Sequence, residues 1–189
     1  MTTLELIKSD FKARGVNPTL SRIIISALFS YGAKPLIYIR LYNIGGGKIC
    51  HFMRPILIRK LKKHYHIELG CNEIGPYLRL PHPYGIIIAA KSIGENVMIG
   101  QYVTIGGNNC KERQDSNGKL IHTPVIGNNC QISAGSVVAG PIVIGDNVVI
   151  GANSTITKDI SSGTLLYNST GVSRHSYIVP GWKGAFHPV

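Results

Sequence analysis

The sequence predicts an α-helical region of about 66 residues followed by a parallel β-helix built from six-residue repeats. The main observation is a series of aliphatic residues spaced six apart from residue 74 to 156, with one extra residue before position 93, a break after position 105 and glycine following most of these positions. The second observation is that the preceding residues have the periodicity of helices instead. A chain of 189 residues is also long enough to bury an ample core.

Three helices are expected in residues 1–66. Asn17 and Pro18 form a typical helix start, with Asn17 as the N-cap, which predicts a helix over about 17–30. A second helix is expected over about 35–43, ended by three consecutive glycines. The third, over 48–66, has apolar residues on one face and basic residues on the other. That pattern fits a helix on a membrane surface or one packed on a neighbouring domain, and we favour packing.

The six-residue repeat has a simple physical explanation. Each hexad forms a short strand and a turn, with its aliphatic side chain pointing inward and its small neighbour allowing a tight corner. Three hexads complete one triangular coil, and stacked coils bury a continuous apolar stripe. The spacing predicts two coils before a break in the repeat and two after it. The predicted inward residues are Ile74, Leu80, Ile86, Ile93, Ile99, Ile105, Ile126, Ile132, Val138, Ile144, Ile150 and Ile156.

The break, residues 107–122, reads GNNCKERQDSNGKLIH and is polar and rich in turn-forming residues. Such a segment cannot join the coil, so it is expected to loop out from it. The predicted organisation is a helical region at 1–66, a β-helix at 67–165 with an extruded loop at 107–122, and a C-terminal extension at 166–189.

The positive charge is concentrated in the helical region. Residues 1–68 hold twelve Lys and Arg against three Asp and Glu, whereas residues 69–189 hold eight against six. This asymmetry suggests attraction to a membrane surface or a polyanionic saccharide, although a solvated basic helix face explains it equally well. Nucleic acid is not expected as a partner, because no recognition motif accompanies the charge.

The chain has no uninterrupted apolar run of about 18 residues and no secretory signal at its N-terminus, so a cytoplasmic protein is expected. Its four cysteines show no C-x-x-C spacing, which favours reduced thiols over a zinc site, and no metal is expected.

Several motifs together resemble the serine acetyltransferase branch of the hexapeptide-repeat acyltransferases. These are the hexads, the segment HPYGIIIAAKSIGENVMIGQYVTIGG, the long loop that ends in a histidine, and the late TGVSRH, which together cover about residues 66–176. The resemblance implies a left-handed parallel β-helix, usually trimeric, with acetyl-CoA lying along a groove between neighbouring coils. Polysaccharide O-acetyltransferases of the colanic-acid type share this branch, and this chain has their short helical N-terminus.

The resemblance also implies two catalytic histidines, His82 and His122. A hydroxyl is a weak nucleophile, so His82 is expected to remove the acceptor's proton as its oxygen attacks the thioester. An imidazole near its ordinary pKa suits that task at neutral pH. Backbone N–H groups at Gly106 and Gly107 are expected to stabilise the oxyanion, and His122 to orient the acceptor.

Two departures from the family pattern bear on the acceptor. Serine acetyltransferases carry an aspartate directly before the first histidine, where this chain has Pro81, so Glu68 becomes the expected orienting carboxylate and Glu73 a poorer one. They also carry an arginine before the second histidine, suited to the serine carboxylate, where this chain has Ile121. Loss of that arginine points to a neutral sugar hydroxyl.

The expected cosubstrate contacts also follow from the resemblance. Gly107, Asn108, Ala134 and Ala152 correspond to groove positions, where small residues let the pantetheine amides pair with strand backbone. The same residues would serve as corner residues in any hexapeptide coil. Arg174, followed by a histidine, is the expected contact for the CoA phosphates.

The preferred function is therefore an acetyl-CoA-dependent O-acetyltransferase acting on a saccharide or lipid-linked saccharide in surface polysaccharide synthesis. Contact with the inner face of the membrane through the basic helices is a hypothesis. The alternatives are a serine O-acetyltransferase of cysteine biosynthesis and, from another class, a non-catalytic trimeric scaffold. A zinc lyase of the γ-carbonic anhydrase kind is disfavoured, because the repeats supply two histidines and it needs three.

Overall fold

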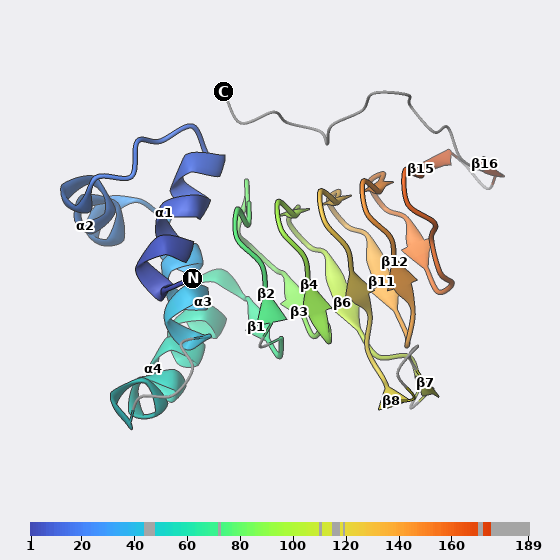
Figure 1. Ribbon diagram of the computed structural model, residues 1–189, viewed down its shortest axis with the longest axis horizontal. Coiled ribbons are helices and arrows are strands. Elements are labelled where there is room, and N and C mark those ends of the chain that lie inside the picture. Colours follow the sequence, from blue (N-terminus) through green and yellow to red (C-terminus); the bar gives the residue numbers. More distant parts are fainter. Residues whose placement is uncertain are drawn as a thin grey trace.

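The computed structural model describes residues 1–43, 48–71, 73–109, 111–114, 118, 120–169 and 172–174. A group of helices covers one end of a parallel β-helix, whose coils stack away from them in sequence order (Figure 1). The predicted fold class, an α-helical N-terminal region followed by a parallel β-helix of hexapeptide repeats, is confirmed.

The described part of the helical region contains four helices: α1 (Thr3–Ala13), α2 (Leu20–Phe29), α3 (Lys34–Tyr42) and α4 (Lys48–Tyr65). Sequence analysis missed α1, which begins with a capping box in which the Glu5 amide donates to Thr2 Oγ1 at 3.3 Å. The N-cap of α2 is Thr19 and not Asn17, because the Thr19 hydroxyl accepts a hydrogen bond from the Arg22 amide. The glycines expected to end the second helix lie outside the described residues.

The β-helix has three faces. Face A contains β1 (Glu68–Leu69), β3 (Ile87–Ile88), β6 (Thr104–Gly106), β11 (Val137–Ala139) and β14 (Thr155–Ile156). Face B contains β2 (Glu73–Ile74), β4 (Ser92–Ile93), β9 (Val125–Ile126) and β12 (Val143–Ile144). Face C contains β5 (Met98–Ile99), β10 (Gln131–Ile132), β13 (Val149–Ile150) and β15 (Leu165–Ser169), and β16 (Val172–Arg174) pairs antiparallel with β15.

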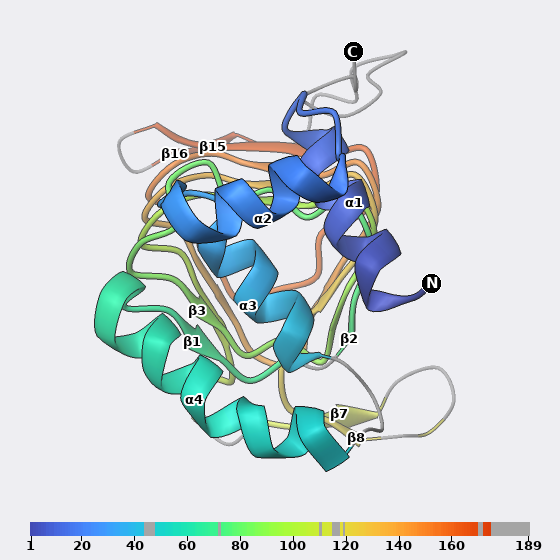
Figure 2. The ribbon, with the colours of Figure 1, turned by 90° about the vertical axis from the view of Figure 1, so that its left-hand side faces the viewer.

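The chain visits faces A, B and C in turn, giving the triangular outline seen along the coils in Figure 2. The extruded segment leaves between β6 and β9, which are the face A and face B strands of the third coil. Each side of the break holds the two expected coils and further strands beyond them. The count began at Ile74, whereas the first coil begins one face earlier, at Glu68. The extruded segment contains a hairpin of β7 (Arg113–Gln114) and β8 (Leu120–Ile121).

The core confirms the repeat. All twelve predicted inward aliphatics are buried, with at most 8% of each residue exposed. Along each face A strand the side chains alternate, so Leu69, Ile88 and Ile105 align inside the coil while Glu68, Ile87 and Thr104 align outside it. The corner after face B requires glycine: a methyl group added at Gly94 would lie 2.6 Å from the Gly127 carbonyl oxygen in the next coil.

A buried ion pair joins the helices to the first coil. Arg40 of α3 donates two hydrogen bonds to the Asp10 carboxylate of α1 and one each to the carbonyls of Ile74 and Gly75, all at 2.7–2.8 Å. Asp10 also accepts the Leu78 amide at 2.8 Å. Both charged side chains are completely buried. The helices thus satisfy backbone groups at the open end of the coil that would otherwise lack partners.

No single helix in the described parts of the chain is both long and apolar enough to cross a membrane. Helices α2 and α3 meet these criteria only when taken together, and they are bent by 107° at their break.

Candidate active site

Two corners of the β-helix hold the predicted site residues. The CA corner joins face C to face A, and its backbone hydrogen bonds form a column. The Tyr102 amide donates to the Tyr84 carbonyl at 3.1 Å, the Gly135 amide to Gln101 at 2.9 Å, and the Asn153 amide to Ala134 at 2.9 Å. The AB corner joins face A to face B, and the extruded segment leaves from it in the third coil.

His82 lies at the beginning of the CA corner and is exposed. Its carbonyl accepts the Tyr84 amide at 2.8 Å, and the Gly85 amide donates to the Tyr65 carbonyl at 2.9 Å. Pro83 is buried whereas Pro81 is exposed, so the segment is anchored immediately after the histidine. Within the described part of the chain, the His82 imidazole makes no hydrogen bond or ion pair. It is therefore accessible to a substrate, and its backbone is fixed on the C-terminal side.

His122 lies at the AB corner, where the extruded segment returns to the coil. Its side chain is 59% exposed, and its Nδ1 lies 3.6 Å from Glu112 Oε2, a contact that becomes an ion pair when the imidazole is protonated. The hairpin register places Arg113 opposite Ile121. Arg113 also donates to Asp159 at 2.7 Å, which ties the hairpin to the last coil. His122 is thus held by a loop that has its own anchor on the β-helix.

Gly106, Gly107 and Asn108 share the AB corner with His122. The Gly106 carbonyl accepts the Gly140 amide at 2.9 Å. A methyl group added at Gly106 would meet open space, and one at Gly107 would lie 3.4 Å from the His122 carbonyl oxygen. The Gly106 and Gly107 backbone is therefore accessible beside His122, as an oxyanion or pantetheine contact requires.

Ala134 and Ala152 lie at the other corner, in the same column as Tyr84. Ala152 is exposed and Ala134 is partly exposed. For Arg174 the structure gives a backbone pairing with Tyr167 in the β15–β16 ribbon, and its side chain is not described. The histidine that follows it lies outside the described residues.

One chain does not bring all the predicted site residues together. His82 and the two alanines lie at the CA corner, whereas His122 and the glycine turn lie at the AB corner, and face A separates the two groups. Glu68 is on the outside of face A, where it pairs with Lys62 of α4 at 3.3 Å, both side chains being more than half exposed. Among the described residues, no hydrogen bond or ion pair joins Glu68 to His82.

Sequence analysis did not single out Glu112 or the tyrosines at the CA corner. Glu112 meets His122 only because the extruded segment folds back as a hairpin. Tyr102 carries a sequence signal, since it is a large residue at a corner where the following coils have Gly135 and Asn153.

The described cysteines do not provide a nucleophile. Cys71 and Cys130 are buried, and burial raises the pKa of each thiol to about 11. No group of three or more His, Cys, Asp or Glu in the described parts of the chain is arranged to hold a metal ion.

Comparison with known proteins agrees with this architecture. Residues 123–158 match the family model described as bacterial transferase hexapeptide (six repeats). The serine acetyltransferase of Staphylococcus xylosus is 36% identical over 162 residues, which are 85% of this chain and 63% of that protein. The chain is similar to serine acetyltransferases over most of its length. This chain spans less than two thirds of the length of the curated relatives it matches, and the S. xylosus enzyme is covered to a greater extent than the others compared.

Solved structures show the same fold. Serine acetyltransferase isoform 3 of Entamoeba histolytica, solved with cysteine, aligns over 92% of this chain and 60% of its own, with a TM-score of 0.63 and 27% identity. A serine acetyltransferase solved with CoA aligns over 92% of this chain and 69% of its own, with a TM-score of 0.67 and 19% identity. The helical N-terminal region followed by a parallel β-helix is therefore an architecture found in serine acetyltransferases.

Proposed function

We propose that this protein is an acetyl-CoA-dependent O-acetyltransferase of the serine acetyltransferase type, with His82 as its general base. The observation that carries the proposal is the position of His82: an accessible imidazole on an anchored segment, at a β-helix corner whose later coils carry Ala134 and Ala152, in a chain similar to serine acetyltransferases. The solved complex of a serine acetyltransferase of the same fold with CoA supports acetyl-CoA as the cosubstrate. Ala134 and Ala152 leave the corner backbone open to the pantetheine amides.

The proposed chemistry needs no other reactant. The His82 imidazole takes the proton of the acceptor hydroxyl while the hydroxyl oxygen attacks the thioester carbonyl carbon of acetyl-CoA. Backbone N–H groups at the Gly106–Gly107 turn stabilise the resulting oxyanion. The carbon–sulfur bond then breaks, and the CoA thiolate takes the proton back from the imidazolium. The products are an O-acetyl ester and free CoA.

The separation of His82 from His122 supports a site shared between two copies of the chain. In a cyclic trimer, the CA corner of one subunit can meet the AB corner of its neighbour, which would bring both histidines to one acetyl-CoA. The test is co-expression of H82Q with H122Q. Random assembly gives about one quarter of the sites both histidines, so activity should rise well above that of either variant. Activity no higher than the mean of the two variants would argue for sites within single chains.

The acceptor has two candidates. Similarity to serine acetyltransferases favours L-serine, and it supports this alternative better than the saccharide that sequence analysis preferred. A specific observation keeps a saccharide hydroxyl as the second candidate. Ile121, which stands where the resemblance implies an arginine, is 2% exposed and packed inward, so it offers no group to a substrate carboxylate. A role in surface polysaccharide synthesis belongs to this second candidate.

Thiol release from acetyl-CoA tests the proposal, measured with L-serine and with a panel of methyl glycopyranosides. H82Q should lower kcat by a factor of roughly 10² to 10⁴, the range typical of a lost general base. H64Q is the matched control, because His64 is an exposed histidine on α4 whose side chain makes no hydrogen bond or ion pair among the described residues. An H82Q protein with wild-type kcat would refute His82 as the base, and a wild-type protein that does not bind CoA would refute the enzyme assignment.

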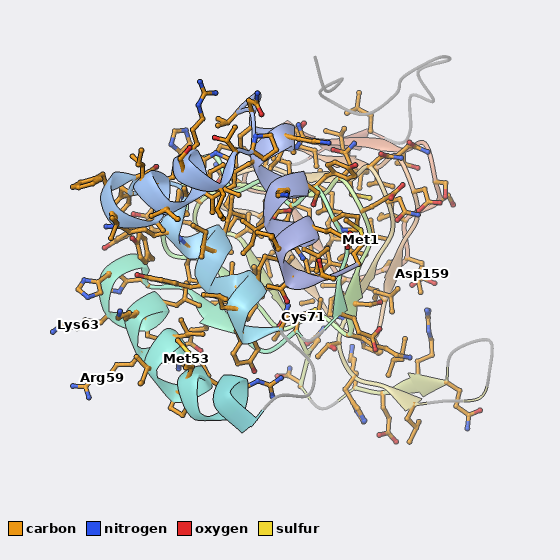
Figure 3. The ribbon with its side chains drawn as sticks, turned by 60° about the vertical axis from the view of Figure 1, so that its left-hand side comes forward. Met1, Met53, Arg59, Lys63, Cys71 and Asp159 are labelled. Carbon is orange, nitrogen blue, oxygen red and sulfur yellow. The ribbon has the colours of Figure 1, made fainter. Side chains whose placement is uncertain are left out.

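We also propose peripheral contact of the helical end with an anionic lipid surface. Helix α2 exposes most of its apolar side chains, Phe29 by 81%. Helix α4 carries a basic face, and Arg59 and Lys63 project from it away from the β-helix (Figure 3). Both helices lie at the end of the molecule opposite the last coil (Figure 2). An apolar helix face and a cationic one at the same end of the molecule are together complementary to an anionic membrane surface.

Flotation with phosphatidylglycerol vesicles at low salt tests this contact, with phosphatidylcholine vesicles as the control. The protein should float with the anionic vesicles only, and F29S should weaken the association. If the protein stays unbound to anionic vesicles at low salt, the membrane contact is wrong and the basic face is simply solvated.

A further inference from the structure

The CA corner contains a tyrosine in a backbone conformation that bulky residues avoid. Tyr102 has φ +56°. The equivalent corner positions in the other coils are Gly85, Gly135 and Asn153, with φ values of +66°, +72° and +56°. Glycine and asparagine are the residues that adopt this conformation at low cost, whereas an ordinary side chain there costs about 1–2 kcal/mol. The geometry of the turn therefore does not explain why a tyrosine occupies this position.

Burial does not explain it either, because 60% of Tyr102 is exposed. The other tyrosine in a left-handed conformation, Tyr77, is a useful contrast. It lies at the corner between faces B and C in the first coil, and its amide donates to Ser9 Oγ of α1, so it belongs to the contact with the helices. Tyr102 makes no such contact with the helical region among the described residues. A costly conformation that leaves a side chain exposed suggests a role in binding.

The ring of Tyr102 is held firmly in place. It lies over Gly85, where an added methyl group would be only 2.5 Å from Tyr102 Cδ1 and 2.7 Å from Cε1. Its edge meets the ring of Tyr84, with centroids 5.9 Å apart and planes at 79°. The ring of Tyr84 in turn lies against that of His66, with centroids 4.9 Å apart. These three side chains, His66, Tyr84 and Tyr102, form an aromatic row along the corner, in which the Cδ1–Cε1 edge of Tyr102 lies against Gly85.

The middle member of the aromatic row is joined to the backbone of the proposed general base. Tyr84 is two residues after His82 and is hydrogen-bonded to its carbonyl, and Gly85, beneath the Tyr102 ring, is the next residue. A pyranose ring has C–H groups on its faces and hydroxyls around its edge. It can therefore pack a face on an aromatic ring while an edge hydroxyl points to a base beside that ring. L-Serine has no comparable apolar face.

We propose that the aromatic row is an acceptor subsite for a pyranose sugar, with Tyr102 as the stacking platform that places a ring hydroxyl at His82. This inference rests on the proposed acetyltransferase function and selects the saccharide from the two candidate acceptors. Tyr84 supports the Tyr102 ring from its edge. Tyr102 is a positioning residue, since the bond-making atoms belong to the acceptor, the thioester and His82.

The test is kinetic and compares Y102N with Y102F. Asparagine suits the left-handed backbone, as it does at position 153, so Y102N should fold with an unchanged or higher Tm. It should raise KM for the best methyl glycopyranoside by about tenfold, and this rise should exceed any change in the CoA dissociation constant. Y102F keeps the stacking face and should retain KM within about twofold. Y77N is the matched control and should leave KM for the sugar unchanged.

Three outcomes would overturn the subsite: an unchanged sugar KM in Y102N, a wild-type protein that acetylates L-serine but none of the glycosides, or a change of oligomeric state in Y102N by analytical ultracentrifugation. The last would show that the aromatic row is a contact between subunits. None of these three outcomes would contradict the proposed acetyltransferase function, which is tested separately by CoA binding and by H82Q.

Discussion

Replacing Arg40 with methionine should detach the helical region from the β-helix. The guanidinium donates four hydrogen bonds, two to the Asp10 carboxylate and two to the carbonyls of Ile74 and Gly75. Methionine fills a similar apolar volume but leaves the buried Asp10 carboxylate without its cation. Burial already raises the pKa of Asp10, and Arg40 and the Leu78 amide oppose that rise. Removing one partner of such a pair costs about 3–5 kcal/mol.

That magnitude can be measured by native-state hydrogen exchange. Because the contact joins α1 and α3 to the first coil, R40M should lower protection of those helices by a factor of roughly 150 to 5,000 if they open as a unit. Protection of β10 and β13, which lie in the third and fourth coils, should change little. Urea unfolding followed by circular dichroism at 222 nm should show the helices melting earlier.

The double variant R40M/D10N provides the control. The side chain that D10N introduces has no charge, but its oxygen can still accept a hydrogen bond from the Leu78 backbone N–H. The double variant should therefore be more stable than the sum of the two single effects predicts. A double variant whose effects simply add would show that the charge pair contributes nothing beyond packing. Unchanged exchange in α1 and α3 of R40M would refute the conclusion that this pair fastens the helices.

The remaining predictions concern the coil corners and the extruded hairpin. G94A should lower the free energy of unfolding by about 1–3 kcal/mol, because the added methyl group meets the backbone of the next coil. In G106A the methyl group points into open space, so Tm should stay unchanged. Equal Tm values for the two variants would contradict the corner geometry. Burial acts to raise the pKa of Asp159, but the Val143 amide and Arg113 lower it overall. Its anchoring of the hairpin should therefore hold at neutral pH and be lost only as pH falls through this lowered pKa. D159N should accelerate tryptic cleavage after Arg113 at pH 7.5, and wild-type cleavage rates in D159N would show that the anchor is unimportant.

The repeat could be predicted from sequence because it is local. Inward positions such as Ile99 and Ile132 are fixed by a period of six, whereas in β3 the residue in line with Ile105 is Ile88 and not the predicted Ile86. Helix α1 was missed because its start depends on Thr2 and Glu5 at the extreme N-terminus. The first strand of the β-helix was not expected because it begins at Glu68, before the aliphatic series becomes regular.

The sequence by itself determined the fold class, the buried aliphatics and the extruded loop, since each is encoded in residue spacing or composition, and its resemblance to a family implied the two candidate histidines. Only the tertiary structure decided that His82 and His122 lie at different corners, that Glu68 pairs with Lys62, and that Tyr102 lies over Gly85. The physical reason is that spacing along the chain fixes which way a side chain points. Which residues become neighbours depends on how successive coils stack, and stacking joins positions that are a whole coil apart in sequence.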